Sequence, residues 1–265
     1  MTVIDELFAR TRSENRAALV GYLPSGFPTK EQSIRAIRAM VEGGVDLVEI
    51  GLPYSDPVMD GPVIQAAAEQ ALAAGARTND VFDVVEATAA TGVPTVVMTY
   101  WNPVERHGVE RFAADLAAAG GSGLITPDLI PDEAGEWIDA SAAHDLDRVF
   151  LVAPSSTDER LAMTVEAASG FVYATAVMGV TGAREQTSSL GEQLVARVRA
   201  VSDKPVGVGL GVSNGTQAHE IAAYADAVIV GSALVRCLLD APDEAAGIDA
   251  IRALANDLRA GVERS

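Results

Sequence analysis

Residues 205–234 read PVGVGLGVSNGTQAHEIAAYADAVIVGSAL, and no other stretch says more about the fold. It holds an apolar run at 205–208, a glycine-rich loop, a helix-like segment at 214–223 and a second apolar run at 227–230. Neither run alternates polar and apolar residues, which is typical of parallel strands buried on both faces. The stretch therefore predicts a strand, a crossover helix and a second parallel strand.

The same alternation extends over the whole chain. Strands are expected at 18–23, 45–50, 94–99, 123–126, 148–152, 171–176, 205–208 and 227–230. Helices are expected between them at 29–43, 62–74, 79–91, 104–119, 132–143, 157–168, 190–200, 214–223 and 242–260, with an extra helix at 5–12. A doubly wound open sheet is the alternative, but its usual order needs only five or six strands. Eight βα units predict an α/β protein with a (β/α)8 TIM barrel as a single domain over 1–265.

Composition and charge exclude several classes of protein. The chain carries 37 Asp and Glu against 19 Lys and Arg, a formal net charge of −18, and 49% of its residues are hydrophobic. Such a composition is that of a packed globular protein, and its negative field repels nucleic acid and anionic lipid. The lone Cys237 excludes an internal disulfide, and neither a signal peptide nor a membrane span is apparent. We expect a soluble, cytoplasmic protein.

Two kinds of loop stand out, because function in a barrel lies on the loops that follow the strands. The loops at 51–61 and 177–189 are long, and the second suits either a mobile lid or an ordinary surface loop. The loops after the last two strands carry Gly211, Gly231 and Ser232. Glycines let backbone N–H groups approach an anion, and a helix N-terminus adds positive charge. These loops predict a phosphate ester ligand, the alternative being that the glycines only make tight turns.

Acidic residues gather in 46–62, which reads DLVEIGLPYSDPVMDGP. Glu49 has the strand parity of Leu47, so it is expected to face the barrel interior, where burial raises the pKa of a carboxyl group. Such a group can act as a general acid–base, the alternative being a glutamate held by structural hydrogen bonds at the rim. Asp60 lies just before a helix and could instead be a cap. Since no histidine or spaced ligand set accompanies these acids, no metal is expected.

Residues 48–65, VEIGLPYSDPVMDGPVIQ, closely resemble the signature of the tryptophan synthase alpha chain family. Three later motifs match that family in order, at 179–182, 209–213 and 231–235, and the resemblance covers about 8–258. It implies cleavage of indole-3-glycerol phosphate to indole and glyceraldehyde 3-phosphate by a retro-aldol reaction in tryptophan biosynthesis. No metal or organic cofactor on this chain is implied.

The resemblance also implies roles for individual residues. Glu49 would protonate C3 of the indole and take a proton from the 3′-hydroxyl, while Asp60 would stabilise the positive charge at the ring N–H. Tyr173 would face the active site near Glu49. The other implied substrate-binding residues are Tyr22 and Tyr100 for the indole, and Thr181, Gly182, Gly211, Gly231 and Ser232 around the phosphate.

A partner is implied as well. By resemblance, a beta chain carrying pyridoxal phosphate would contact Pro53, Asp56 and Pro57, in an alpha2-beta2 heterotetramer. Met59 and the 130–131 loop depart from the family pattern, which affects interface detail rather than chemistry. Two alternatives stay open: a free-standing lyase that supplies indole elsewhere, and a catalytically idle subunit that only activates its partner. Another phosphate-binding barrel, such as an isomerase or indole-glycerol-phosphate synthase, is less favoured; the synthase would need a lysine that the first four strands lack.

Overall fold

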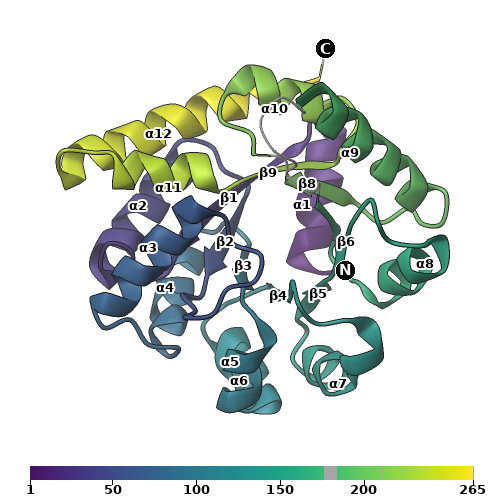
Figure 1. Ribbon diagram of the computed structural model, residues 1–265, viewed down its shortest axis with the longest axis horizontal. Coiled ribbons are helices and arrows are strands. Elements are labelled where there is room, and N and C mark those ends of the chain that lie inside the picture. Colours follow the sequence, from purple (N-terminus) through teal and green to yellow (C-terminus); the bar gives the residue numbers. More distant parts are fainter. Residues whose placement is uncertain (176–183, 210, 265) are drawn as a thin grey trace.

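A ring of parallel strands forms the centre of the molecule, and helices surround it (Figure 1). The computed structural model describes residues 1–175, 184–209 and 211–264. Within them, the strands are β1 (Ala18–Pro24), β2 (Leu47–Gly51), β3 (Thr95–Met98), β4 (Gly123–Ile125), β5 (Asp147–Val149), β6 (Leu151–Val152), β7 (Val172–Thr175), β8 (Val206–Gly209) and β9 (Ala227–Val230). The strand positions agree with the predicted ones to within two residues at most ends.

The order of the strands is that of a closed barrel. It runs β5-β4-β3-β2-β1-β9-β8-β7-β6, and every pair is parallel. The first and last members of this order, β5 and β6, are separated in the chain by the single residue Phe150, which is buried. The predicted strand at 148–152 is therefore observed as two short segments. The (β/α)8 prediction is confirmed, with the fifth strand interrupted.

The described helices alternate with the strands. They are α1 (Val3–Ser13), α2 (Lys30–Glu42), α3 (Pro62–Ala73), α4 (Asp80–Ala89), α5 (Trp101–His107), α6 (Val109–Ala118), α7 (Gly135–Ala143), α8 (Asp158–Ala167), α9 (Arg184–Arg199), α10 (Gly215–Ala222), α11 (Ser232–Leu239) and α12 (Glu244–Gly261), with a 3-10 turn η1 (Pro131–Glu133).

Three helix predictions need correction. The helix expected at 104–119 is two helices, because Gly108 has a φ of 94° and interrupts α5 and α6. The helix α11 was not predicted separately. Since α9 begins at Arg184, the end of the loop expected at 177–189 is helical, while 176–183 lie outside the described residues.

One end of the barrel is closed by α1, the extra helix that the sequence predicted (Figure 1). Its Ile4, Leu7 and Phe8 pack in one buried cluster with Val20 of β1 and with Phe171, which immediately precedes β7. These are the strands' amino-terminal ends, where buried Arg16 also pairs with Asp46. The opposite end, where the strands finish, is left for a binding site.

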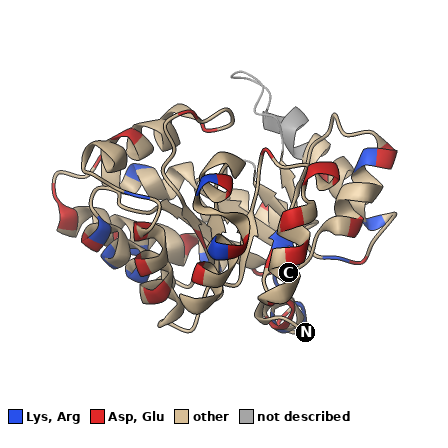
Figure 2. Cartoon of the chain, turned by 90° about the horizontal axis from the view of Figure 1, so that it is seen from below, with Lys and Arg blue, Asp and Glu red and all other residues tan. Residues whose placement is uncertain are grey.

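The outer surface carries mixed charges. In Figure 2, Lys and Arg residues are interspersed with Asp and Glu along the helices. Arg252 lies 2.9 Å from Glu42, and Arg197 lies 2.8 Å from Asp158. Among the described helices, none is both long and apolar enough to cross a membrane.

Candidate active site

A cavity of about 230 Å³ lies at the carboxyl ends of the strands, opposite α1. Its walls combine acids, hydroxyl groups, apolar side chains and glycines. The lining residues are Tyr22, Glu49, Met59, Asp60, Gly61, Ile64, Met98, Tyr173, Gly209, Gly211, Ile229, Gly231 and Ser232. The two predicted acids, Glu49 and Asp60, thus face the same cavity.

Glu49 lies in the middle of β2 and is 2% exposed. Its Oε2 is buried and has no hydrogen-bond partner among the described residues. Burial, followed by the charge of Asp60, raises the pKa of Glu49 to about 8. At neutral pH this carboxyl group is mostly protonated, so it can donate a proton to a ligand. The alternative of a glutamate held by structural hydrogen bonds finds no support in the described contacts.

Asp60 ends the loop between β2 and α3 and is held at two points. The hydroxyl of Tyr100 donates to its Oδ1 at 2.9 Å, and Nε2 of Gln65 donates to its backbone carbonyl at 2.8 Å. Burial raises the pKa of Asp60, and the Tyr100 hydrogen bond opposes that rise. The N-cap of α3 is Gly61, without a side-chain cap. The interpretation of Asp60 as a helix cap is therefore wrong.

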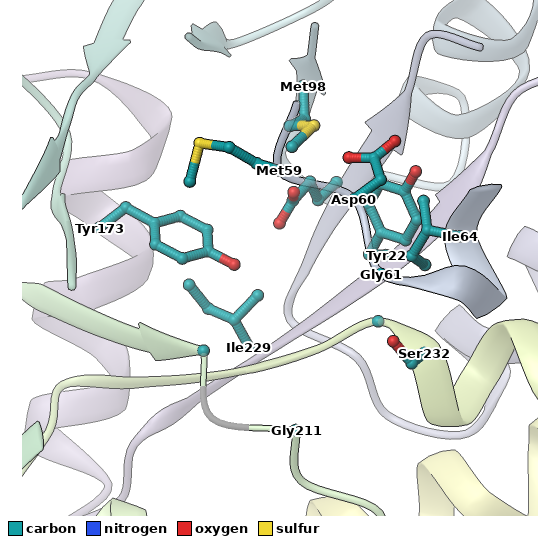
Figure 3. A pocket seen from close by; sticks show the side chains of 13 residues that line it. Tyr22, Met59, Asp60, Gly61, Ile64, Met98, Tyr173, Gly211, Ile229 and Ser232 are labelled. Carbon is teal, nitrogen blue, oxygen red and sulfur yellow. The ribbon is translucent and has the colours of Figure 1, made fainter. Parts of the chain in front are cut away.

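Tyr22 and Tyr173 enter the cavity from opposite sides (Figure 3). Neighbouring glycines make room for them, because a Cβ at Gly51 would collide with the Tyr22 hydroxyl and one at Gly209 would lie 2.7 Å from that of Tyr173. Burial raises the pKa of both hydroxyls well above the ordinary value. The charge of Asp60, and then that of Glu49, raises the pKa of Tyr22 further, and Glu49 raises that of Tyr173. Both tyrosines therefore stay protonated and can donate hydrogen bonds.

Tyr100, predicted to pack on an indole ring, lies behind Asp60 and is not among the residues that line the cavity. It is 3% exposed, and its ring packs on Tyr54 with centroids 5.3 Å apart. Its hydroxyl also accepts a hydrogen bond from the N–H of Met59 at 3.0 Å. Tyr100 therefore contacts Asp60, which lines the cavity, and does not line the cavity itself.

The glycine loops lie on the side of the cavity away from Asp60 (Figure 3). Gly211 has a φ of 67°, a conformation that favours glycine. Gly231 is the N-cap of α11 and Ser232 its first residue, and the first N–H groups of a helix lack partners within it. This arrangement suits an anion without a lysine or arginine. Thr181 and Gly182, predicted to bind the same ligand, lie outside the described residues.

An apolar wall was missed by the sequence reasoning. Ile64 of α3, Met98 at the end of β3 and Ile229 of β9 line the cavity together with the half-exposed Met59. The inward parity of Met98 and Ile229 near their strand ends was the available signal. These side chains suit a flat apolar ring. In the described part of the chain, no three His, Cys, Asp or Glu residues gather into a possible metal site.

The predicted partner-contact residues lie on the outer side of the same loop. Asp56 is exposed, while Pro53 and Pro57 are half-exposed. Pro53 and Asp56 border a surface hollow that Arg106 of α5 also lines. Val58 in this loop is 77% exposed, so the segment before Asp60 presents an apolar side chain to solvent.

Known proteins resemble this chain over its whole length. The sequence profile of the family described as tryptophan synthase alpha chain matches residues 8–263. The tryptophan synthase alpha chain of Salinispora arenicola is 65% identical over 99% of this chain and 98% of that protein. The corresponding protein of Acidothermus cellulolyticus is 62% identical, covering 100% and 98%.

Solved structures also resemble this chain in both fold and sequence. A chain of Mycobacterium tuberculosis tryptophan synthase is 57% identical with a TM-score of 0.93, covering 100% of this chain and 99% of that one. Tryptophan synthase subunit alpha from Legionella pneumophila is 30% identical with a TM-score of 0.90, covering 99% and 98%. Full coverage at such identity, on a barrel that brings Glu49 and Asp60 to one cavity, means that this chain belongs to the tryptophan synthase alpha chain family.

Proposed function

We propose that this chain is a carbon–carbon lyase that cleaves indole-3-glycerol phosphate to indole and glyceraldehyde 3-phosphate. The observation that carries the proposal is the pair of acids at the cavity. Glu49 is buried with one oxygen unpartnered among the described residues, and Asp60 faces the same space while held by Tyr100. Two carboxyl groups in different environments can divide proton transfer and charge stabilisation between them without a metal.

The reaction begins with a proton transfer. Protonated Glu49 gives its proton to C3 of the indole, which removes the aromaticity of the ring and leaves positive charge on the ring nitrogen. Asp60 accepts a hydrogen bond from the ring N–H and stabilises that charge. Glu49, now a carboxylate, takes the proton of the 3′-hydroxyl. The O–H electrons form the aldehyde carbonyl, and the broken carbon–carbon bond returns its electrons to the indole.

The rest of the cavity supports the choice of substrate. The apolar wall formed by Ile64, Met98 and Ile229 suits the indole ring, and the loops of Gly211 and Gly231 suit the phosphate. We propose that Tyr173, whose hydroxyl keeps its proton, orients the substrate or the Glu49 carboxyl group.

We propose a beta chain as the partner, with pyridoxal phosphate bound only there and an alpha2-beta2 stoichiometry. Similar chains come from structures of Mycobacterium tuberculosis tryptophan synthase, which supports such a partner. The exposed loop around Asp56 is the proposed contact. A single domain and a cytoplasmic location complete the proposal. A free-standing lyase and an idle subunit are less favoured, the second because both acids are present.

Indole release by the purified chain, measured with and without a beta chain from a close relative, tests the function. We expect a low basal rate that rises roughly 5- to 150-fold with the partner, as a coupling of about 1–3 kcal/mol allows. Asp56→Ala should reduce the activation more than the basal rate. Absence of indole release both with and without the partner would contradict the lyase assignment.

A further inference from the structure

Tyr100 makes two hydrogen bonds with the end of the loop that carries Asp60, between β2 and α3. The hydroxyl of Tyr100 donates to Oδ1 of Asp60 at 2.9 Å and accepts from the N–H of Met59 at 3.0 Å. One hydroxyl therefore binds both a side chain and the backbone before it. Together with the Gln65 contact to the Asp60 carbonyl, it fixes a segment whose earlier part, around Val58, is exposed.

Tyr100 is itself held from a third loop. It is the N-cap of α5, and the next N–H, that of Trp101, donates to both carboxylate oxygens of Asp128, at 2.9 and 3.2 Å. Asp128 lies in the loop after β4. The hydroxyl of Thr99 donates to the carbonyl of Tyr100 at 3.0 Å. The loops after β2, β3 and β4 are thus joined through a short series of hydrogen bonds that ends at Asp60.

We infer that Tyr100 is a positioning residue that orients the Asp60 carboxylate toward the ligand, and that Asp128 holds Tyr100 in place. The inference rests on the proposed function. Because Tyr100 occupies Oδ1, in the described part of the chain Oδ2 is the oxygen that remains for a ligand N–H. A carboxylate without this contact would sample several rotamers, and few of them would face the indole nitrogen.

The contact also affects protonation, which distinguishes it from simple packing. A hydrogen bond to the ionised form favours that form, so loss of the Tyr100 hydroxyl should raise the pKa of Asp60 further. Among the described residues, the other titratable groups facing Asp60 are Glu49 of β2 and Tyr22 of β1, and both are retained in the variants below. Removal of the hydroxyl should therefore move the acidic limb of the pH profile to higher pH.

Tyr100→Phe tests the inference, since it keeps the ring and its packing on Tyr54. Measured as indole release in the presence of the beta chain, kcat should fall about tenfold, the effect of losing one hydrogen bond to a charged group. KM should change less than about twofold if substrate contacts are untouched. The matched control is Tyr224→Phe, which removes a hydroxyl outside the cavity and should behave as wild type.

Variants at Asp128 provide a second, independent test. Asp128→Ala removes the acceptor for the Trp101 N–H and should reproduce a smaller fall in kcat, whereas Asp128→Asn keeps an acceptor oxygen and should restore most of the activity. The control is Asp132→Ala, which removes a nearby exposed acid that pairs with Arg160. Thermal unfolding of each variant distinguishes a loss of folded protein from a loss of the Asp60 orientation.

The possible results separate the two proposals. If wild type releases no indole, the proposed lyase function fails. If wild type is active and Tyr100→Phe keeps its kcat and pH profile, the lyase stands and the positioning role is overturned. A raised KM with unchanged kcat would make Tyr100 a binding residue and would also overturn it. If Tyr100→Phe unfolds, Asp128→Ala decides by the same criteria.

Discussion

Two buried carboxyl groups, one just before β2 and one in the middle of it, have opposite surroundings. Asp46, just before β2, accepts hydrogen bonds from both terminal nitrogens of Arg16, at 2.6 and 2.8 Å, and from the N–H of Leu19. Glu49, three residues later and also buried, has an oxygen without a partner in the described residues and a pKa raised to about 8. The chain therefore compensates one carboxylate and leaves the other uncompensated.

The difference follows the two ends of the barrel. At the end closed by α1, a buried charge without a partner would only reduce stability, so Arg16 compensates it. At the open end, an uncompensated acid keeps its proton near neutral pH and is available to a ligand. Conservative changes at the two positions should therefore alter different properties.

The largest effect is expected on activity. Glu49→Gln preserves shape but cannot exchange a proton, so indole release should fall by about 10²- to 10⁴-fold. Its unfolding temperature at neutral pH should exceed that of wild type, because wild-type Glu49 loses its proton only on unfolding, which favours the unfolded state, and Gln cannot do so. Steady-state kinetics with thermal unfolding checks both. A variant within about threefold of wild-type activity would remove Glu49 from the mechanism.

The next effect is on stability. Asp46→Ala leaves Arg16, 5% exposed, without its main partner. We expect the free energy of unfolding to fall by about 3 kcal/mol, the low end for breaking a buried pair, because Glu14 still lies 2.6 Å from Arg16. Urea denaturation measures the change. Asp249→Ala, which removes an exposed partner of Arg252, is the control and should cost less than about 0.5 kcal/mol. If both variants lost the same free energy of unfolding, the proposed contrast between the two ends of the barrel would be wrong.

A pH series examines the contrast at Glu49 directly. Between the ordinary glutamate pKa of 4.5 and the raised value of about 8, unfolded Glu49 loses its proton while folded Glu49 keeps it. The contribution of Glu49 to the free energy of unfolding therefore falls as pH rises from 4.5 to about 8, by up to about 1.4 kcal/mol per pH unit. Denaturation of wild type and Glu49→Gln at several pH values isolates the slope. A stability difference that does not change with pH would mean that Glu49 has an ordinary pKa.

The smallest effect is expected at the glycine loops. A Cβ at Gly231 would make ordinary contact with Tyr22 at 3.5 Å, so Gly231→Ala should fold normally while narrowing the proposed phosphate site. We expect KM to rise about tenfold, which corresponds to a weakened hydrogen bond to a charged group. Gly135→Ala, where an added Cβ meets nothing within 4 Å, is the matched control. An unchanged KM would place the phosphate elsewhere.

Much of the fold was predictable because each strand is a separate apolar run with its own crossover helix. The sequence could not show the break at Phe150, since the 148–152 run is apolar throughout, apart from Arg148. Nor could it show α11, because Gly231 and Ser232 fit a loop and a helix start equally well. Local pattern defines elements better than their ends.

The two acids were predictable from parity and loop position, but their neighbours were not. That Tyr100 lies behind Asp60 depends on the contact between Asp128 and the start of α5, a tertiary arrangement with no local signal. The inward face of Met98 and Ile229 was recoverable from strand parity. The contacts that set the pKa of Glu49 required the folded chain.

The interruption at Phe150 also governs how chains can associate. The carbonyl of Phe150 accepts from the N–H of Tyr173 on one side, and that of Val149 accepts from the N–H of Thr126 on the other, at 3.1 and 3.4 Å. The two edges of the sheet thus meet within one stretch of chain. Exposed strand edges are the usual templates for amyloid-like pairing, and closed barrels remove them. A second protein must therefore dock on loops and helices. Mutations that promote aggregation should be those that break the hydrogen bonds on either side of Phe150 and expose the two strand edges.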